Sequence, residues 1–322
     1  MSTTSTDIAV GFANEDWAGD ARYFEYSAAA DPIRSGHTPR IPIEQFPASL
    51  HVGRPTGVTA LDLSGPLGLE AGPATSPALV ASFVCIAAGD RLETRAAATS
   101  ELFVVLRGAG RSTVGTDVLD WAEGDIFVLP CGAEPTHEAT SDAAFYWVTD
   151  EPLLRYLGVT PTEARFAPTY FAHDRLQAEL DIVARDPLAL ARSRVSVLAA
   201  TASQTQTLTA THVLWAMYGL LPVGAVQRPH RHQSVALDLI LEAQPGCYSL
   251  VGHKLDDAGE IIDPIRVEWE SGGAFVTPPG MWHAHINESG VPARLLPVQD
   301  AGLHTYLRSL DIRFAPAPAP SA

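Results

Sequence analysis

The sequence has few cysteines, an excess of acidic over basic residues and no long apolar run. Its three cysteines are widely spaced, which excludes a disulfide framework and is typical of free thiols in the cytoplasm. The formal net charge is −16, from 21 Lys and Arg against 37 Asp and Glu, and the basic residues form no cluster. Such a surface repels nucleic acid and anionic lipid. No apolar run reaches the roughly 20 residues that span a bilayer, and the N-terminal segment lacks the features of a secretory signal. We therefore expect a cytoplasmic protein that binds neither nucleic acid nor membrane.

The length of 322 residues suits two domains of roughly 100–150 residues each. Short apolar runs bounded by Gly, Pro or Asp occur in two separate stretches, a pattern typical of β-strands joined by tight turns. We therefore predict an all-β fold of two tandem barrels. The expected parts are an N-terminal arm packed on the barrels (1–78), a first barrel (79–150), a helical connector (151–194), a second barrel (195–315) and a disordered tail (316–322).

The connector is the one stretch with apolar residues at helical spacing. The segments EPLLRYLG and DRLQAELDIVARDPLALARS both show this spacing. Asp174, at the start of the second segment, is a candidate helix cap.

The second half contains two histidine motifs. Gly224 is followed by His230 and His232, and a later segment contains Gly272, Pro278, Gly280, His283 and Asn287. Alternate residues of a strand face the same side, so His230 and His232 point into the barrel while Arg231 points away. His283 arrives from another strand after a Pro-Gly turn. Three inward imidazoles predict a site for one divalent metal ion with open positions for other ligands.

Two further groups are predicted to face this site. Asp238 has the same parity as His230 and His232, so it faces the interior if the strand is regular; the alternative is a solvated carboxylate beyond a bulge. A nearby divalent cation offsets the cost of burying that carboxylate. His285, two residues after His283, is a candidate acid or base. We assign catalytic roles to Asp238 and His285.

The first half repeats the turn residues of these motifs but not the histidines. Arg95 and Ala97 stand at the two histidine positions of the first motif, and Pro135 stands at the position of His283. Glu101 and His137 remain, and together they would form a weak site. We predict that the first barrel is degenerate and holds no metal.

The motif pair resembles the cupin superfamily, whose domains are double-stranded β-helix (jelly-roll) barrels. The segments HRHQSVAL and TPPGMWHAHIN, in a duplicated chain without the fourth Glu ligand, resemble the gentisate and salicylate 1,2-dioxygenase family. That resemblance implies an Fe(II)-dependent dioxygenase that cleaves a hydroxylated or amino-substituted aromatic ring with O2. Two departures stand out. The family's best-attested metal lies in the N-terminal cupin, and the family carries an Arg for the substrate carboxylate where this chain has Asp238.

The resemblance also suggests substrate-binding residues, partners and alternatives. Gln227, Arg228, Trp282 and Gln299 are the candidates for contact with a small-molecule substrate. Three imidazoles accept Mn, Ni, Cu or Zn as well as Fe. A non-oxidative metal-dependent cupin enzyme (an isomerase, lyase or hydrolase) and a small-molecule-binding cupin therefore remain open. Bicupins commonly form homo-oligomers, and we expect one here.

Overall fold

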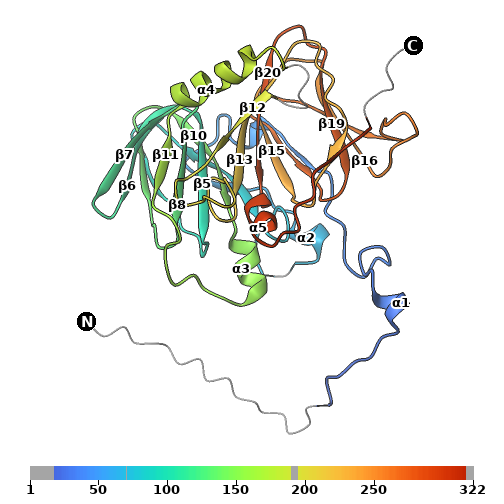
Figure 1. Ribbon diagram of the computed structural model, residues 1–322. Helices are drawn as coiled ribbons and strands as arrows, with labels where there is room; N and C mark the ends of the chain where they lie inside the picture. The colour runs from blue at the N-terminus through green and yellow to red at the C-terminus, as the bar shows by residue number, and fades with distance from the viewer. Residues whose placement is uncertain (1–17, 70, 190–194, 317–322) are drawn as a thin grey trace. The chain divides into compact units, whose positions relative to one another are not determined.

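The computed structural model describes residues 18–69, 71–189 and 195–316 (Figure 1). The chain divides into two units, residues 1–40 and 41–322. The described part of the first unit contains one short helix, α1 (Tyr26–Ala29), whose first turn is capped by the Glu25 carboxylate. Glu25 accepts hydrogen bonds from the backbone N–H groups of Ser27 (3.0 Å) and Ala28 (2.9 Å). All strands of the barrels belong to the second unit.

The first barrel is built from a six-stranded sheet and a four-stranded sheet, with antiparallel pairing throughout. The larger sheet has the strand order β11-β8-β5-β10-β3-β2 and the smaller one β4-β9-β6-β7. Their bounds are β2 Gly57–Ala60, β3 Val80–Ile86, β4 Arg91–Glu93, β5 Ser100–Arg107, β6 Ala109–Val114, β7 Asp117–Ala122, β8 Ile126–Pro130, β9 Thr136–Ala139, β10 Ala143–Thr149 and β11 Thr169–Phe171.

The second barrel repeats this plan with a six-stranded and a five-stranded sheet. The larger sheet has the order β1-β18-β15-β20-β13-β12 and the smaller one β17-β16-β19-β14-β21. Their bounds are β1 Gln45–Phe46, β12 Val195–Ala199, β13 Trp215–Leu221, β14 His230–Arg231, β15 Ala236–Glu242, β16 Cys247–Gly252, β17 Ile265–Glu268, β18 Ala274–Thr277, β19 Trp282–Asn287, β20 Ala293–Gln299 and β21 Arg313–Phe314. The predicted all-β tandem fold is confirmed.

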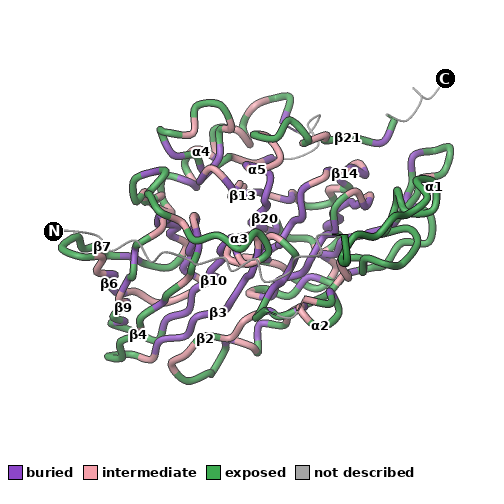
Figure 2. The backbone as a smooth tube through the Cα atoms, turned by 90° about the horizontal axis from the view of Figure 1, so that it is seen from below, coloured by how far each residue is buried: buried purple, intermediate pink, exposed green. Residues whose placement is uncertain are grey.

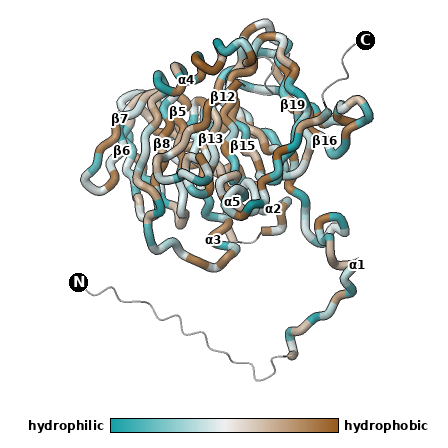
Figure 3. The backbone as a smooth tube through the Cα atoms, viewed as in Figure 1, coloured by the Kyte–Doolittle hydropathy of each residue, from teal (hydrophilic) through white to brown (hydrophobic). Residues whose placement is uncertain are grey.

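The two larger sheets pack on each other through one shared hydrophobic core. Leu102 and Tyr146 of the first barrel belong to the same buried cluster as Leu237 and Val298 of the second. The opposite faces of these sheets line the two barrel interiors, each with its own buried cluster. Because successive residues of a strand face opposite sides, one strand such as β15 serves both cores. Figure 2 shows the buried backbone concentrated in the central strands, and Figure 3 shows hydrophobic stretches along the same strands.

The connector contains two helices and a strand. Helix α3 (Glu151–Leu157) follows β10, and α4 (His173–Arg185) follows β11. The predicted cap at Asp174 was wrong, because α4 begins one residue earlier and Asp174 lies in its first turn. The N-terminal N–H of His173 is instead bound by Asp125 Oδ1 at 2.9 Å. The carboxylate of Asp125, the residue before β8, therefore accepts a hydrogen bond from the first N–H of α4. Because Asp125 is distant from α4 in the sequence, local pattern could not indicate this contact.

Residues 41–67 contribute to both barrels. Strand β1 pairs with β18 of the second barrel, whereas β2 pairs with β3 of the first. A 3₁₀ turn (Ala48–Leu50) and helix α2 (Ser64–Leu67) complete this part, and α5 (Ala301–Tyr306) follows β20. Among the described residues, no helix has the length and apolar character needed to cross a membrane.

Candidate metal centre

Three buried histidines meet inside the second barrel. One ligand atom from each of His230, His232 and His283 lies within 4.8 Å of the others. The ring centroids of His230 and His283 are 4.0 Å apart, and those of His232 and His283 are 4.9 Å apart. The three side chains that the sequence motifs predicted as ligands therefore form one cluster.

Strand pairing brings the three histidines together. His230 on β14 pairs directly with His283 on β19, and His283 pairs on its other side with Val251 of β16. His232 follows β14, and its carbonyl accepts a hydrogen bond from the N–H of Gly280 at 2.7 Å. Gly280 has a φ of +74°, a conformation that glycine adopts without strain. The Pro-Gly turn thus ties the second motif to the first.

Backbone carbonyls orient two of the rings. His232 Nδ1 lies 2.9 Å from the carbonyl oxygen of Ser234, and His283 Nδ1 lies 3.1 Å from that of Met281. A carbonyl only accepts, so both Nδ1 atoms carry the proton and both Nε2 atoms keep their lone pair. A ring nitrogen fixed in this way is the usual support of a metal-ligating histidine. The donor set fits a divalent transition metal.

A side-chain contact extends the support of His232. Ser234 Oγ lies 3.1 Å from His232 Nδ1 and donates to Gln299 Oε1 at 2.8 Å. Gln299 is 4% exposed and pairs with Ala236 across the sheet. Ser234 therefore links the side-chain oxygen of Gln299 to the candidate ligand His232.

His285 is held by a second hydrogen-bonded chain. Trp269 Nε1 donates to Ser249 Oγ at 2.8 Å, and Ser249 Oγ lies 2.7 Å from His285 Nδ1. The ring centroid of His285 is 5.7 Å from that of His283. His283 and His285 lie on the same face of β19, so His285 adjoins the cluster as its spacing predicted.

Asp238 is buried, with 2% of its surface exposed. It alternates along β15 with Leu237 and Leu239, which belong to the core between the barrels, so Asp238 faces the barrel interior. Thr277 Oγ1 donates to Asp238 Oδ2 at 2.7 Å. The strand is regular at this point, and the solvated alternative does not apply.

The remaining candidates, Gln227, Arg228 and Trp282, lie in different surroundings. Gln227 is 6% exposed, its N–H donates to the carbonyl of His285 at 2.9 Å, and its Oε1 is buried with no hydrogen-bond partner among the described residues. Arg228 lies over the ring of Phe314, with 5.1 Å from Cζ to the centroid. Trp282 is on the other face of β19 from His283, where Arg231 Cζ lies 5.2 Å from its ring. The structure does not bring Trp282 into the histidine cluster.

In the first barrel, Glu101 and His137 lie in an aromatic core. Trp147 Nε1 donates to Glu101 Oε2 at 3.0 Å, and burial raises the pKa of Glu101 to about 8. His137 lies 2.7 Å from Ser112 Oγ and 3.0 Å from Thr94 Oγ1, and burial lowers its pKa to about 3. Both residues are thus engaged with side chains of their own barrel.

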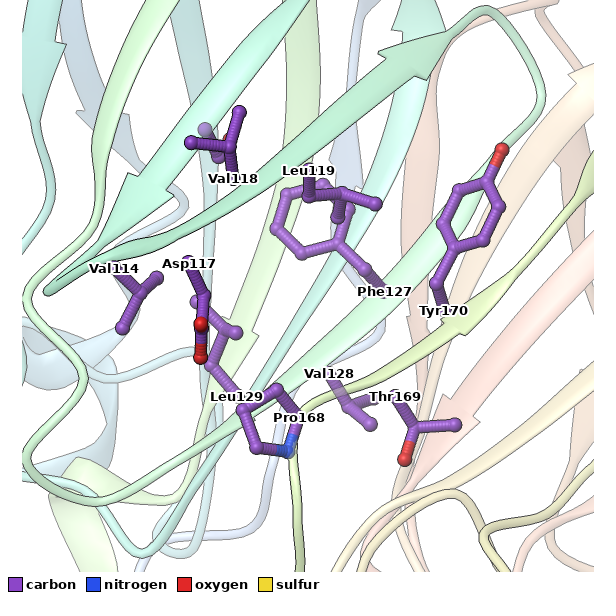
Figure 4. Close-up of a pocket in the computed structure, with 11 residues that line it drawn as sticks. Val114, Asp117, Val118, Leu119, Phe127, Val128, Leu129, Pro168, Thr169 and Tyr170 are labelled. Carbon is purple, nitrogen blue, oxygen red and sulfur yellow. The ribbon is translucent and has the colours of Figure 1, made fainter.

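A hollow of about 190 Å³ lies on the first barrel. Figure 4 shows the residues that line it, and none of them belongs to the second barrel. Val114, Val118 and Leu119 from β6 and β7 line one side of it, and Thr169 and Tyr170 from β11 line another. Its lining is mainly aliphatic and aromatic and contains no histidine. We therefore place the candidate chemistry at the histidine cluster and not at this hollow.

Comparison with solved structures decides the fold family. Salicylate 1,2-dioxygenase from Pseudaminobacter salicylatoxidans superposes with a TM-score of 0.65, at 14% sequence identity, over 86% of this chain and 89% of that one. Its adduct with gentisate gives a TM-score of 0.66 over 90% of both chains, at 15% identity. The chain has the bicupin fold, with two tandem cupin barrels. These identities establish the shared fold.

Two curated proteins are similar to the bicupin in sequence. A 5-aminosalicylate 1,2-dioxygenase from Comamonas sp is 29% identical over 148 residues, which are 44% of this chain and 39% of that protein. A gentisate 1,2-dioxygenase from Haloferax sp is 38% identical over 54 residues, 17% of this chain and 15% of that protein. The bicupin thus matches less than half the length of either relative. No family model matches it. It resembles the gentisate and salicylate 1,2-dioxygenases, as the motifs predicted.

Sequence reasoning missed the residues that support the site. Trp269 and Trp121 each lie three residues before the turn glycine of the second motif, Gly272 or Gly124, so superposing the two halves could have found them. Ser249 and Phe314 carried no comparable signal, because only strand pairing brings them to the histidines.

Proposed function

We propose that this protein is an Fe(II)-dependent dioxygenase that cleaves the ring of a hydroxylated or amino-substituted aromatic small molecule. The observation that carries the proposal is the buried trio of His230, His232 and His283, in which two Nε2 lone pairs are presented by rings fixed through Nδ1. The likeness to ring-cleaving 1,2-dioxygenases in sequence and in fold supports the oxygen chemistry.

His230, His232 and His283 would hold the metal. Bound Fe(II) would offer open coordination positions for a substrate oxygen and for O2. The surrounding barrel excludes bulk water, because the three ligands are each at most 6% exposed. Interactions between the substrate and charged side chains are stronger in such a site than in water.

We assign proton handling to His285. The hydroxyl of Ser249 accepts from Trp269, so its own proton can be donated to His285 Nδ1. A neutral His285 then carries its proton on Nε2. In this tautomer it can donate a hydrogen bond to a substrate oxygen and return the proton in a later step.

Besides the catalytic role expected from the sequence, we assign Asp238 to substrate recognition. A buried carboxylate attracts an amino group or accepts from a hydroxyl, whereas it repels a substrate carboxylate. Comparison of the two barrels supports this role. The pair Phe103 and Trp147 of the first barrel corresponds to Asp238 and Pro297 of the second. Smaller groups thus replace two stacked aromatic rings at this level of the second barrel.

Gln227 and Gln299 complete the assigned polar contacts. The buried Oε1 of Gln227 is suited to accept a hydrogen bond from a substrate hydroxyl or amine. The amide N–H groups of Gln299 are donors next to Ala236, where the fourth ligand of other cupins would stand.

The test is metal analysis of anaerobically purified protein, coupled to oxygen uptake with a panel of catechols, aminophenols and hydroxybenzoates. We expect about one Fe per chain and substrate-dependent uptake of O2. The double variant His230→Ala/His232→Ala should lose both the metal and the uptake. One metal per chain with no uptake across the panel would refute the dioxygenase and favour a non-oxidative metal enzyme or a binding protein. Unchanged metal content in the double variant would refute the site itself.

A further inference from the structure

The last strand among the described residues, β21, lies directly against the strand that carries His230. Strand β21 pairs with β14, with Phe314 opposite His230 and Arg313 opposite Arg231. β14 is two residues long and has β19 on its other side. Without β21, this ligand-bearing strand would be the edge of its sheet, where backbone pairing is incomplete.

A ring stack accompanies this pairing. The rings of Phe314 and His230 are 5.6 Å apart between centroids, with 21° between their planes. The Arg228 guanidinium lies on the Phe314 ring, 5.1 Å from its centroid. Phe314 is 42% exposed, so it forms an outer cover over an imidazole that is itself 6% exposed. Stacking limits the rotation of the His230 ring.

Two hydrogen bonds fix the segment on either side of the stack. The N–H of Ala315 donates to the carbonyl of Pro229 at 2.7 Å, and the N–H of Asp311 donates to Gln233 Oε1 at 2.7 Å. Ala315 is 2% exposed. Residues 311–315 are therefore attached both before and after the His-Arg-His sequence.

We propose that β21 is a clamp that positions His230 for metal binding, with Phe314 as its positioning residue. The Phe314 ring stacks on the His230 ring, and the β21–β14 pairing holds the two residues opposite each other. Loss of a hydrogen-bonded outer partner typically weakens metal affinity about 10–100-fold, and we expect a loss in the same range for the stacked Phe314 ring. The inference rests on the proposed metal site and assigns that site a dependence on the C-terminal segment.

The experiment compares two truncations of the full chain. Removal of residues 313–322 deletes β21, whereas removal of residues 317–322 keeps it and serves as the matched control. The dissociation constant for Co²⁺ is measured by competition with a chelator, and the melting temperature of each apoprotein is recorded. We expect the shorter chain to bind Co²⁺ about 10–100-fold more weakly than the parent, and the control truncation to bind like the parent.

Point variants test the contribution of the Phe314 ring separately from that of the strand. Phe314→Ala should weaken Co²⁺ binding about tenfold at an unchanged apoprotein melting temperature, and Phe314→Tyr should restore it. If the shorter chain does not fold, the comparison of Ala and Tyr at position 314 decides the matter. Parental Co²⁺ affinity in Phe314→Ala would overturn the clamp while leaving the metal site intact. Absence of Co²⁺ binding by the parent would instead overturn the metal site, and the clamp with it.

Discussion

Glu101 makes the stability of this bicupin depend on pH. Its carboxyl is 1% exposed, and burial raises its pKa from 4.5 to about 8, partly offset by the hydrogen bond from Trp147. Below the unfolded pKa, the group is protonated in both states and imposes no penalty. As the pH rises from 4.5 towards 8, the unfolded chain ionises first and gains stability relative to the folded one. Above about 8 the folded carboxyl ionises too, and the penalty is complete.

The size of the effect follows from the shift. Each pKa unit corresponds to about 1.4 kcal/mol, so the free energy of unfolding should fall by about 3 kcal/mol between pH 5 and pH 8 through this group alone. Glu101→Gln removes the ionisation and keeps an oxygen that accepts from Trp147 Nε1. The variant should therefore gain stability relative to the parent as the pH rises.

The assay is urea unfolding of parent and variant at several pH values. Glu123→Gln makes the same chemical change at an exposed position of the same barrel and is the matched control. The difference between parent and Glu101→Gln should grow by about 3 kcal/mol over that interval, while the control difference stays flat. A constant difference between parent and Glu101→Gln would refute the assignment of a buried, protonated carboxyl.

Four other outcomes are expected. Asp238→Arg should shift substrate preference towards carboxylated aromatics while metal content stays near one per chain; loss of the metal would make Asp238 a ligand. Ser249→Ala should lower kcat about tenfold by releasing His285, with little change in metal content; unchanged kcat would remove the positioning role. Glu101→Gln combined with His137→Gln should leave oxygen uptake intact, and a large loss would mean that the first barrel takes part. Removal of the metal by a chelator should lower the free energy of unfolding by about 2.7 kcal/mol, if the parent is compared at a metal concentration 100 times its dissociation constant. Equal unfolding free energies with and without chelator, measured by calorimetry, would contradict metal binding by the folded protein.

The clustering of His230, His232 and His283 could be predicted from the sequence because it depends on local rules. Strand alternation turns His230 and His232 inward, and the Pro-Gly turn directs His283 to them. The same rule turns Trp282 outward, since it precedes His283 by one residue, whereas the family likeness suggests that Trp282 contacts the substrate. Arg228 could not be placed from local pattern, because its partner Phe314 comes from the far end of the chain. The domain limits and the packing of residues 1–40 remain predictions.

The two barrels share a hydrogen-bonded chain that bears on the role of His285. In the first barrel Trp121 Nε1 donates to Ser112 Oγ at 2.9 Å, and Ser112 lies opposite His137 across the strand pair. In the second barrel Ser249 lies opposite His285 in the same way. Each histidine is 13 residues after the turn glycine of its motif.

The first barrel thus contains the same Trp-Ser-His arrangement, although Pro135 stands where the second barrel has the candidate ligand His283. The hydrogen-bonded Trp-Ser-His arrangement therefore does not depend on metal ligation. Its presence alone does not make His285 catalytic. What differs is the surroundings. His137 is enclosed by Phe103, Phe145 and Thr94, whereas His285 adjoins the imidazoles of His230 and His283. We infer that a hydrogen-bonded arrangement common to both barrels holds His285, and that the proposed chemistry of His285 depends on the histidine cluster beside it.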